Sequence, residues 1–184
     1  MSRINIVLFE PEIPGNTGNI MRTCAATECY LHLIEPLGFS LSEKYLKRSG
    51  VNYLENCHYF LYDDLNDFFT RCKGKYYFFT RYGHKPHSDA NFVLNDEEDI
   101  YLIFGKESTG LPLDLLKKNL DNCYRIPMSD NVRALNVSNS VAIALYEALR
   151  QNNYMNLLLD EPFKGKNFIE ESQKSSRLFS RAFL

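Results

Sequence analysis

Short apolar runs alternate with segments of helical periodicity along most of the chain. The apolar runs predict buried strands, and hydrophobic positions spaced three and four apart predict amphipathic helices. Strands are predicted at residues 4–9, 30–34, 59–62, 76–80, 101–104 and 123–126, with the weakest pattern at 59–62. Helices are predicted at residues 17–28, 42–48, 65–72, 113–120 and 137–151, with Ser42 and Asp64 as N-caps. This alternation favours an α/β fold, in which a mostly parallel sheet is covered by helices on both faces.

The same pattern suggests how the chain is divided. Apolar periodicity begins at Ile4 and degrades after about Met155. We therefore expect one α/β domain over residues 1–155 and a C-terminal extension over residues 156–184. Because the first strand begins so early, we expect no separate N-terminal module.

Composition adds little to this picture. Hydrophobic residues make up 45% and charged residues 24% of the chain, values that are typical of a folded globular protein. The formal net charge is -2, so the chain as a whole shows no preference for nucleic acid. Any RNA-binding site must therefore depend on a local cluster of cations.

The cysteines and the apolar runs exclude several other classes of protein. The five cysteines are odd in number and form no C-x-x-C pair, so neither a disulfide framework nor a zinc site is predicted. We expect free, buried thiols in a reducing cytoplasm and no metal. The apolar run at Ile4–Phe9 is too short for a signal peptide, and no stretch approaches the roughly 18 apolar residues of a membrane span.

Ligands of open α/β sheets bind beyond the carboxyl ends of the strands, where this chain has three loops rich in Gly, Asn, Ser and Pro. In the first loop, residues 10–19, Asn16 can cap the following helix, whose free N–H groups favour an anion. Arg22 lies one turn beyond Asn19 and can share its face. A capped helix with an exposed arginine would give the same pattern.

The second loop, residues 104–112, offers close backbone approach at two glycines and one carboxylate, Glu107. Neither G-x-G-x-x-G nor G-x-x-x-x-G-K-[ST] occurs in the chain, which argues against a Rossmann dinucleotide site and a P-loop. An ordinary strand-to-helix turn remains the alternative. The third loop, residues 126–139, has three Asn and Ser residues within its last four positions, more than one helix cap requires.

The three loops, in this order, resemble the three motifs of the SPOUT superfamily of methyltransferases. Its 2'-O-methylating branch has the signatures N-x-G-x-x-x-R, F-G-x-E-x-x-G-L-P and I-P-M…L-N-x-S-N-x-V-A. The matching positions are Asn16, Gly18 and Arg22, then residues 104–112, and then residues 126–128 with 135–142. Within the branch, F-E-P-E-I-P at residues 9–14 and R-S-G at residues 48–50 look like the family that methylates the tRNA wobble nucleotide. The resemblance covers roughly residues 3–155.

The resemblance implies a C-terminal trefoil knot and S-adenosyl-L-methionine bound by loops of that knot. By position, the cofactor-binding residues would be Phe79, Gly105, Ile126, Met128 and Ala134. Relatives often have serine where this chain has Ala134. A missing hydroxyl hydrogen bond costs only about 0.5–1.5 kcal/mol, so we expect weaker cofactor binding rather than none.

The resemblance also implies the catalytic residues. Arginine stays protonated in proteins, so we expect Arg22 to bind an RNA phosphate and stabilise the developing alkoxide rather than act as a base. The residues expected to position the ribose and Arg22 are Asn16, Glu107, Ser138 and Asn139. Histidine has a suitable pKa for a base, but the sequence around His84 and His87 favours a polar surface loop over a catalytic role.

The partners implied are the anticodon stem-loop of a tRNA and a second copy of the chain. The helix at residues 137–149 is apolar on nearly all sides, which fits either a buried core helix or half of a dimer interface. An RNA-binding patch would combine cations across the dimer, namely Arg22, Lys44, Lys47, Arg48, Lys106 and Arg133.

Two other functions fit the sequence. One is a 2'-O-methyltransferase acting on another tRNA position or on rRNA, although the expected lack of an added RNA-binding domain favours the minimal wobble enzyme. The other is a non-catalytic RNA-binding relative, against which the joint presence of Asn16, Arg22, Glu107 and Asn139 speaks. Cofactor binding distinguishes the second, since an inactive relative need not retain it.

Overall fold

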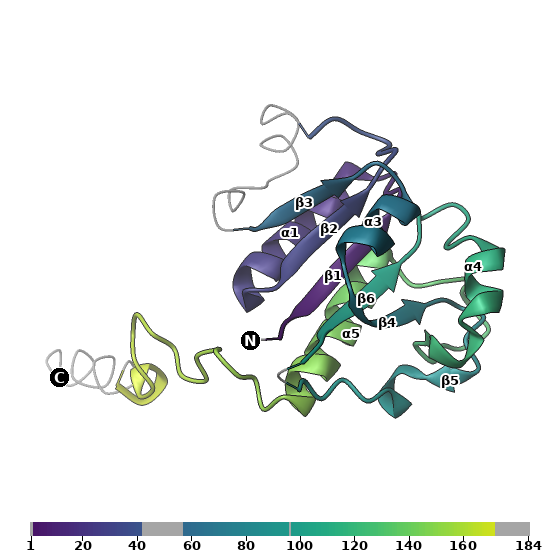
Figure 1. Cartoon of the computed structure of the whole chain (residues 1–184). Helices are drawn as coiled ribbons and strands as arrows, with labels where there is room; N and C mark the ends of the chain where they lie inside the picture. The colour runs from purple at the N-terminus through teal and green to yellow at the C-terminus, as the bar shows by residue number, and fades with distance from the viewer. Residues whose placement is uncertain (1, 42–56, 96, 172–184) are drawn as a thin grey trace, which may run out of the picture. The chain divides into compact units, whose positions relative to one another are not determined.

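The computed structural model describes residues 2–41, 57–95 and 97–171, and a parallel sheet is its central element (Figure 1). The strands are β1 (Ile4–Phe9), β2 (Tyr30–Ile34), β3 (Tyr59–Tyr62), β4 (Gly74–Phe79), β5 (Lys85–Pro86), β6 (Asp99–Phe104) and β7 (Cys123–Arg125). Among the described residues they form a seven-stranded sheet in the order β3-β2-β1-β6-β4-β7-β5. Every ladder between these strands is parallel, which confirms the predicted α/β fold.

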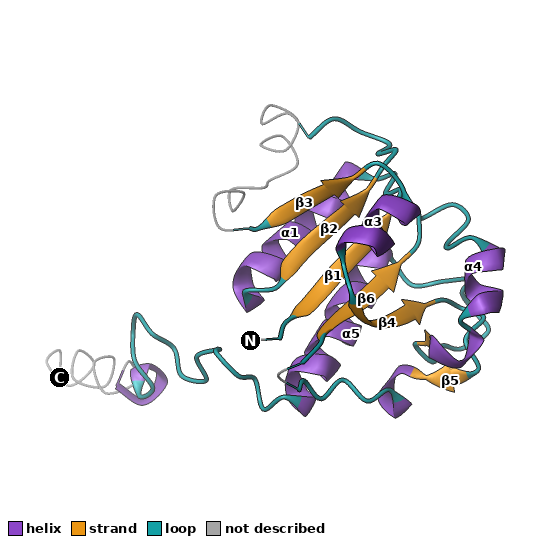
Figure 2. Cartoon of the chain, in the orientation of Figure 1, coloured by secondary structure: helices purple, strands orange, loops and turns teal. Residues whose placement is uncertain are grey.

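Helices cover both faces of this sheet (Figure 2). The helices are α1 (Pro14–Thr27), α3 (Leu65–Arg71), α4 (Leu113–Lys118), α5 (Val137–Gln151) and the 3-10 turns η2 (His87–Asp89) and η3 (Leu120–Asn122). Helices α1 and α5 pack on one face, whereas Phe68 of α3 and Leu116 of α4 belong to the core of the other. Because both faces are covered, all six residues of β1 are buried, and all but Asn5 are apolar.

Most predicted elements are confirmed, with small differences at their ends. Strands β4 and β6 begin two residues earlier than predicted, because Gly74 and Asp99 pair with each other at the start of the ladder. The predicted N-cap at Asp64 is confirmed, since its carboxylate accepts a hydrogen bond from the Asp67 amide at 2.8 Å. The predicted helix at residues 42–48, including the Ser42 cap, lies outside the described residues.

The predicted start of α1 was wrong. The sequence predicted a helix from Thr17 capped by Asn16, but α1 begins at Pro14 and Ile13 occupies the N-cap position. Proline suits the first helical turn because its missing N–H has no partner there in any case. The Asn16 side chain is therefore released from capping and is buried, with 7% of its surface exposed.

The chain divides into two compact units, residues 1–153 and residues 154–184. Turns and bends make up most of the described part of the second unit, where Leu158, Leu159 and Phe163 are exposed. The five cysteines are all free and buried, as predicted. Among the described residues, no helix is long and apolar enough to cross a membrane. The same residues contain no cluster of His, Cys, Asp and Glu side chains suited to a metal ion.

A buried polar group stands out within the sheet. His32 on β2 donates from Nε2 to Oδ1 of Asn5 at 3.1 Å, and its Nδ1 accepts from the Tyr62 hydroxyl at 2.7 Å. The Asn5 amide nitrogen donates to the Arg3 and Ile100 carbonyls, which turns Oδ1 toward the histidine. Burial lowers the pKa of His32 to about 4, so the folded protein keeps this ring neutral.

We expect the free energy of unfolding to decrease as the pH falls from about 6.5 to about 4. In that window the unfolded chain binds a proton at His32, whereas the folded chain does not. The loss from this group can reach about 3 kcal/mol. Urea denaturation at pH 7 and pH 5 measures it, and a His32→Asn variant should show a shallower decline. An equal decline in both proteins would contradict the assignment.

Candidate active site

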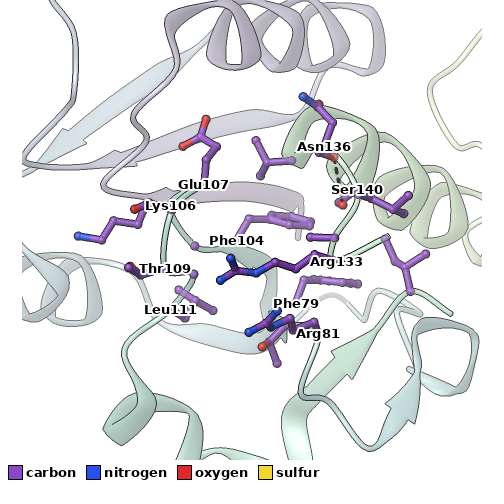
Figure 3. Close-up of a pocket in the computed structure, with 18 of the residues that line it drawn as sticks. Phe79, Arg81, Phe104, Lys106, Glu107, Thr109, Leu111, Arg133, Asn136 and Ser140 are labelled. Atoms are coloured by element: carbon purple, nitrogen blue, oxygen red, sulfur yellow. Dashed lines mark hydrogen bonds between the residues drawn. The ribbon is translucent and has the colours of Figure 1, made fainter. Parts of the chain in front are cut away.

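A cavity of about 600 Å³ opens at the carboxyl ends of β4, β6 and β7 (Figure 3). Its walls come from the segments after these strands and from the first turns of α1 and α5. Parallel strands end at one edge of the sheet, so loops far apart in sequence meet there. The volume lies in the range of about 300–1,000 Å³ that is typical of small-molecule sites.

The floor of the cavity is apolar. Phe79 and Phe104 are register partners on β4 and β6, and their rings stack 4.8 Å apart at an interplanar angle of 11°. Leu111, Ile126 and Met128 extend this surface. Such a floor suits a flat, weakly polar group, such as a purine base.

The loop after β6 is folded back tightly on itself. The Gly110 amide donates to the Lys106 carbonyl at 2.8 Å, and Gly110 adopts a φ of +77°. A Cβ atom on Gly105 would lie 2.2 Å from the carbonyl carbon of Gly110 and 2.3 Å from the Leu111 amide nitrogen. Both glycines are therefore required by the backbone that shapes this side of the cavity.

A chain of hydrogen bonds joins the three predicted loops. The Glu107 carboxylate accepts from the Asn16 side-chain amide at 2.8 Å and from the backbone amides of Glu12 and Ile13 at 2.9 and 3.3 Å. Oδ1 of Asn16 in turn accepts from the Asn136 side chain at 2.9 Å. The three loops are thus joined through the buried Asn16 amide, the half-buried Glu107 carboxylate and the exposed Asn136 amide.

Asn136 completes this chain by capping α5. Its Oδ1 accepts from the Ser138 amide at 2.9 Å, the Ser138 hydroxyl at 2.6 Å and the Asn139 amide at 3.4 Å. Ser138 and Asn139, both predicted to position substrate, therefore contribute to the cap and do not line the cavity. Asn136 lines it instead and was missed, although it belongs to the polar cluster that the sequence showed.

A second group of polar interactions connects the first loop to the second. The Glu12 carboxylate accepts from the Ser108 amide and hydroxyl, both at 2.8 Å, and these bonds lower the pKa of Glu12. Glu10 forms an ion pair with Lys106 at 2.6 Å, and the hydrogen bond raises the pKa of the lysine. The F-E-P-E segment thus holds the loop after β6 in place.

The structure brings most of the predicted site residues together. All five residues predicted to bind the cofactor line the cavity, as do Asn16 and Glu107. Arg22 lies on the exposed side of α1, roughly 9 Å along the helix axis from Asn16, and does not line it. His84 and His87 do not line it either. Lys44, Lys47 and Arg48 lie outside the described residues.

The fold and the site define a class: an α/β protein whose ligand cavity is built from three loops at the carboxyl edge of a parallel sheet. Residues 3–146 match the model of the SpoU rRNA Methylase family. The chain belongs to this family of methyltransferases.

Individual relatives agree with this assignment. The chain is 50% identical over 165 residues to a Listeria monocytogenes protein provisionally named tRNA (cytidine(34)-2'-O)-methyltransferase, covering 89% of this chain and 97% of the relative. A solved structure described as giving insight into the 2-OH methylation of C/U34 on tRNA superposes with a TM-score of 0.75. It is 39% identical, and the match covers 83% of this chain and 97% of the other.

A more distant structure shows the same fold. The SpoU methyltransferase AviRb from Streptomyces viridochromogenes, solved with the cofactor AdoMet, superposes with a TM-score of 0.70 at 22% identity. The match covers 83% of this chain and 58% of that protein.

Proposed function

We propose that this protein transfers the methyl group of S-adenosyl-L-methionine to the 2'-hydroxyl of the wobble nucleotide, a cytidine or a modified uridine, in a tRNA anticodon loop. The meeting of all three motif loops in one cavity, tied together through Glu107, Asn16 and Asn136, carries the proposal. The names of the relatives supply the position of the nucleotide.

The cavity fits the cofactor. Its apolar floor at Phe79, Ile126 and Met128 suits the adenine, and the backbone near Gly105 and Ala134 lies within reach of a bound nucleoside. When bound, the cofactor supplies a methyl group on a positively charged sulfur. The trefoil knot around this cavity is part of the proposal and follows from the family resemblance.

The residues of this chain have two tasks in the transfer. The first is to align the ribose oxygen with the methyl group, which can contribute about 7–11 kcal/mol to lowering the barrier. We assign it to the hydrogen-bonded chain of Asn16, Glu107 and Asn136. The second is to stabilise the developing alkoxide, which we assign to Arg22, anchored by an RNA phosphate, while the 2'-hydroxyl proton passes to a phosphate, to water or to another base.

We further propose that the active enzyme is a homodimer. Helix α5 buries one face, whereas Ile143 and Tyr146 on its other face are 38% and 48% exposed. The helix is therefore not a fully buried core helix, and a dimer interface accounts for its apolar sequence. A second chain would also explain why Arg22 does not reach the cavity of its own chain.

A protein of this size is suited to contact a small and exposed part of a tRNA. Nucleotides in an anticodon loop can be splayed out and read directly, which suits an enzyme of this size. With a net charge of -2, the protein must hold RNA through a few local cations, so activity should fall with added salt.

Nucleoside mapping tests the substrate. Purified protein and cofactor are incubated with total tRNA from a strain that lacks this protein, and 2'-O-methyl groups are located by mass spectrometry. We expect methylation at the wobble ribose. Methylation only in the D-arm, or on a base instead of a ribose, would reject this substrate while leaving the methyltransferase class intact.

A further inference from the structure

Two arginines line the cavity in addition to the residues that the sequence assigned to the cofactor. Arg81 follows β4, and Arg133 lies in the loop that leads to α5. Figure 3 shows the Arg133 side chain extending among the other lining side chains, between Phe104 and Phe79 in this view. Neither position belongs to the motif residues that carry the family resemblance.

The positive charge of these arginines is not balanced by the cavity itself. Lys106 already pairs with Glu10, and the Glu107 carboxylate is occupied by Asn16 and two backbone amides. Within the described part of the chain, no ion pair joins Arg81 or Arg133 to a carboxylate. A ligand that fills the cavity therefore lies next to the guanidinium groups of Arg81 and Arg133, which would stabilise an anionic group on that ligand.

Two contacts with the neighbouring Tyr82 orient the Arg81 side chain. Its guanidinium stacks on the ring of Tyr82, 4.6 Å from the centroid, and donates a hydrogen bond to the Tyr82 hydroxyl. A stacked guanidinium loses less side-chain freedom when it binds, and its planar fork matches a carboxylate. Arg133 is exposed and can adjust to whatever occupies the cavity.

We propose that Arg133, supported by Arg81, binds the carboxylate of the amino-acid part of S-adenosylmethionine. This carboxylate is the anion that the cavity ligand itself carries. Pairing it with a guanidinium also offsets the repulsion between the arginines and the cationic sulfur of the cofactor. The inference depends on the proposed function only for the identity of the cofactor, not for the RNA substrate.

Calorimetry with two ligands tests this pairing. S-adenosylhomocysteine carries the amino-acid part, whereas 5'-methylthioadenosine lacks it. We expect Arg133→Ala to weaken binding of the first about tenfold or more and to change binding of the second less than about twofold. Arg133→Lys should lose less, and the double variant Arg81→Ala with Arg133→Ala should lose more. Lys75→Ala, which removes an exposed cation paired with Glu98 outside the cavity, serves as the matched control.

Other results would overturn the inference. Equal weakening of both ligands would show that Arg133 shapes the cavity instead of pairing with the carboxylate. Unchanged binding of both, with a loss of tRNA affinity, would show that the arginines bind RNA phosphates. If the unaltered protein bound neither ligand, the cofactor assignment itself would fail, which is distinguishable from both outcomes.

Discussion

Gly105→Ala is expected to weaken S-adenosylhomocysteine binding by at least about 100-fold and to remove methylation. The added Cβ would lie within 2.2–2.6 Å of backbone atoms of Gly110 and Leu111, so the loop after β6 must open. Displacements of about 1 Å at a positioned site can cost about 10²-fold. The same clash should lower stability by about 1–3 kcal/mol. Calorimetry measures binding, and urea denaturation measures stability.

Gly15→Ala is the matched control. Gly15 lies in the first turn of α1, and a Cβ atom there would have nothing within 4 Å. We expect this variant to bind S-adenosylhomocysteine as tightly as the unaltered protein does. If Gly105→Ala remained folded and bound normally, the loop would be more plastic than its contacts indicate, and its role in shaping the cavity would be wrong.

The sequence predicted most of the sheet because strands that are buried on both faces appear in the sequence as nearly continuous apolar runs. Strand β1 is wholly buried and almost wholly apolar. Strand β3 lacks a long apolar run, but its four consecutive aromatic and aliphatic residues favour a strand by their intrinsic propensity. The strand order could not be predicted, since it depends on which crossovers pack together. The ends of β4 and β6 were missed because Gly74 and Asp99 pair through their backbones, which composition does not reveal.

The site was predicted in part, and the errors share a cause. The local sequence assigned Asn16 to a helix cap, a role that is common for asparagine, and only the family resemblance assigned it to positioning the ribose. In the structure it bonds to Glu107 and Asn136, residues 91 and 120 positions away in the chain. Partners at such distances follow from the tertiary fold alone. For the same reason the sequence assigned no role to Arg81 and placed Arg133 in the expected RNA-binding patch instead of beside the cofactor.

Arg22→Ala is expected to reduce methylation at least about 10²-fold while changing S-adenosylhomocysteine affinity less than about twofold. Arg22 lies on α1 away from the cavity lining, so its removal leaves the cofactor contacts intact. The proposed role, binding an RNA phosphate and stabilising the alkoxide, concerns tRNA binding and methyl transfer but not cofactor binding. Single-turnover methylation and calorimetry measure the two quantities. Equal damage to cofactor binding would place Arg22 in a different part of the site.

A mixed dimer tests where Arg22 acts. Chains carrying Arg22→Ala and Gly105→Ala are expressed together with different tags, and dimers holding one of each are purified. If Arg22 serves the cavity of the partner chain, one of the two sites combines an intact cavity with an intact arginine. We then expect about half of the unaltered activity, although each variant alone is inactive. If Arg22 serves the cavity of its own chain, both sites carry a defect, and the mixed dimer should be as inactive as its parents. That result would reject the two-chain site while leaving the catalytic role of Arg22 in place.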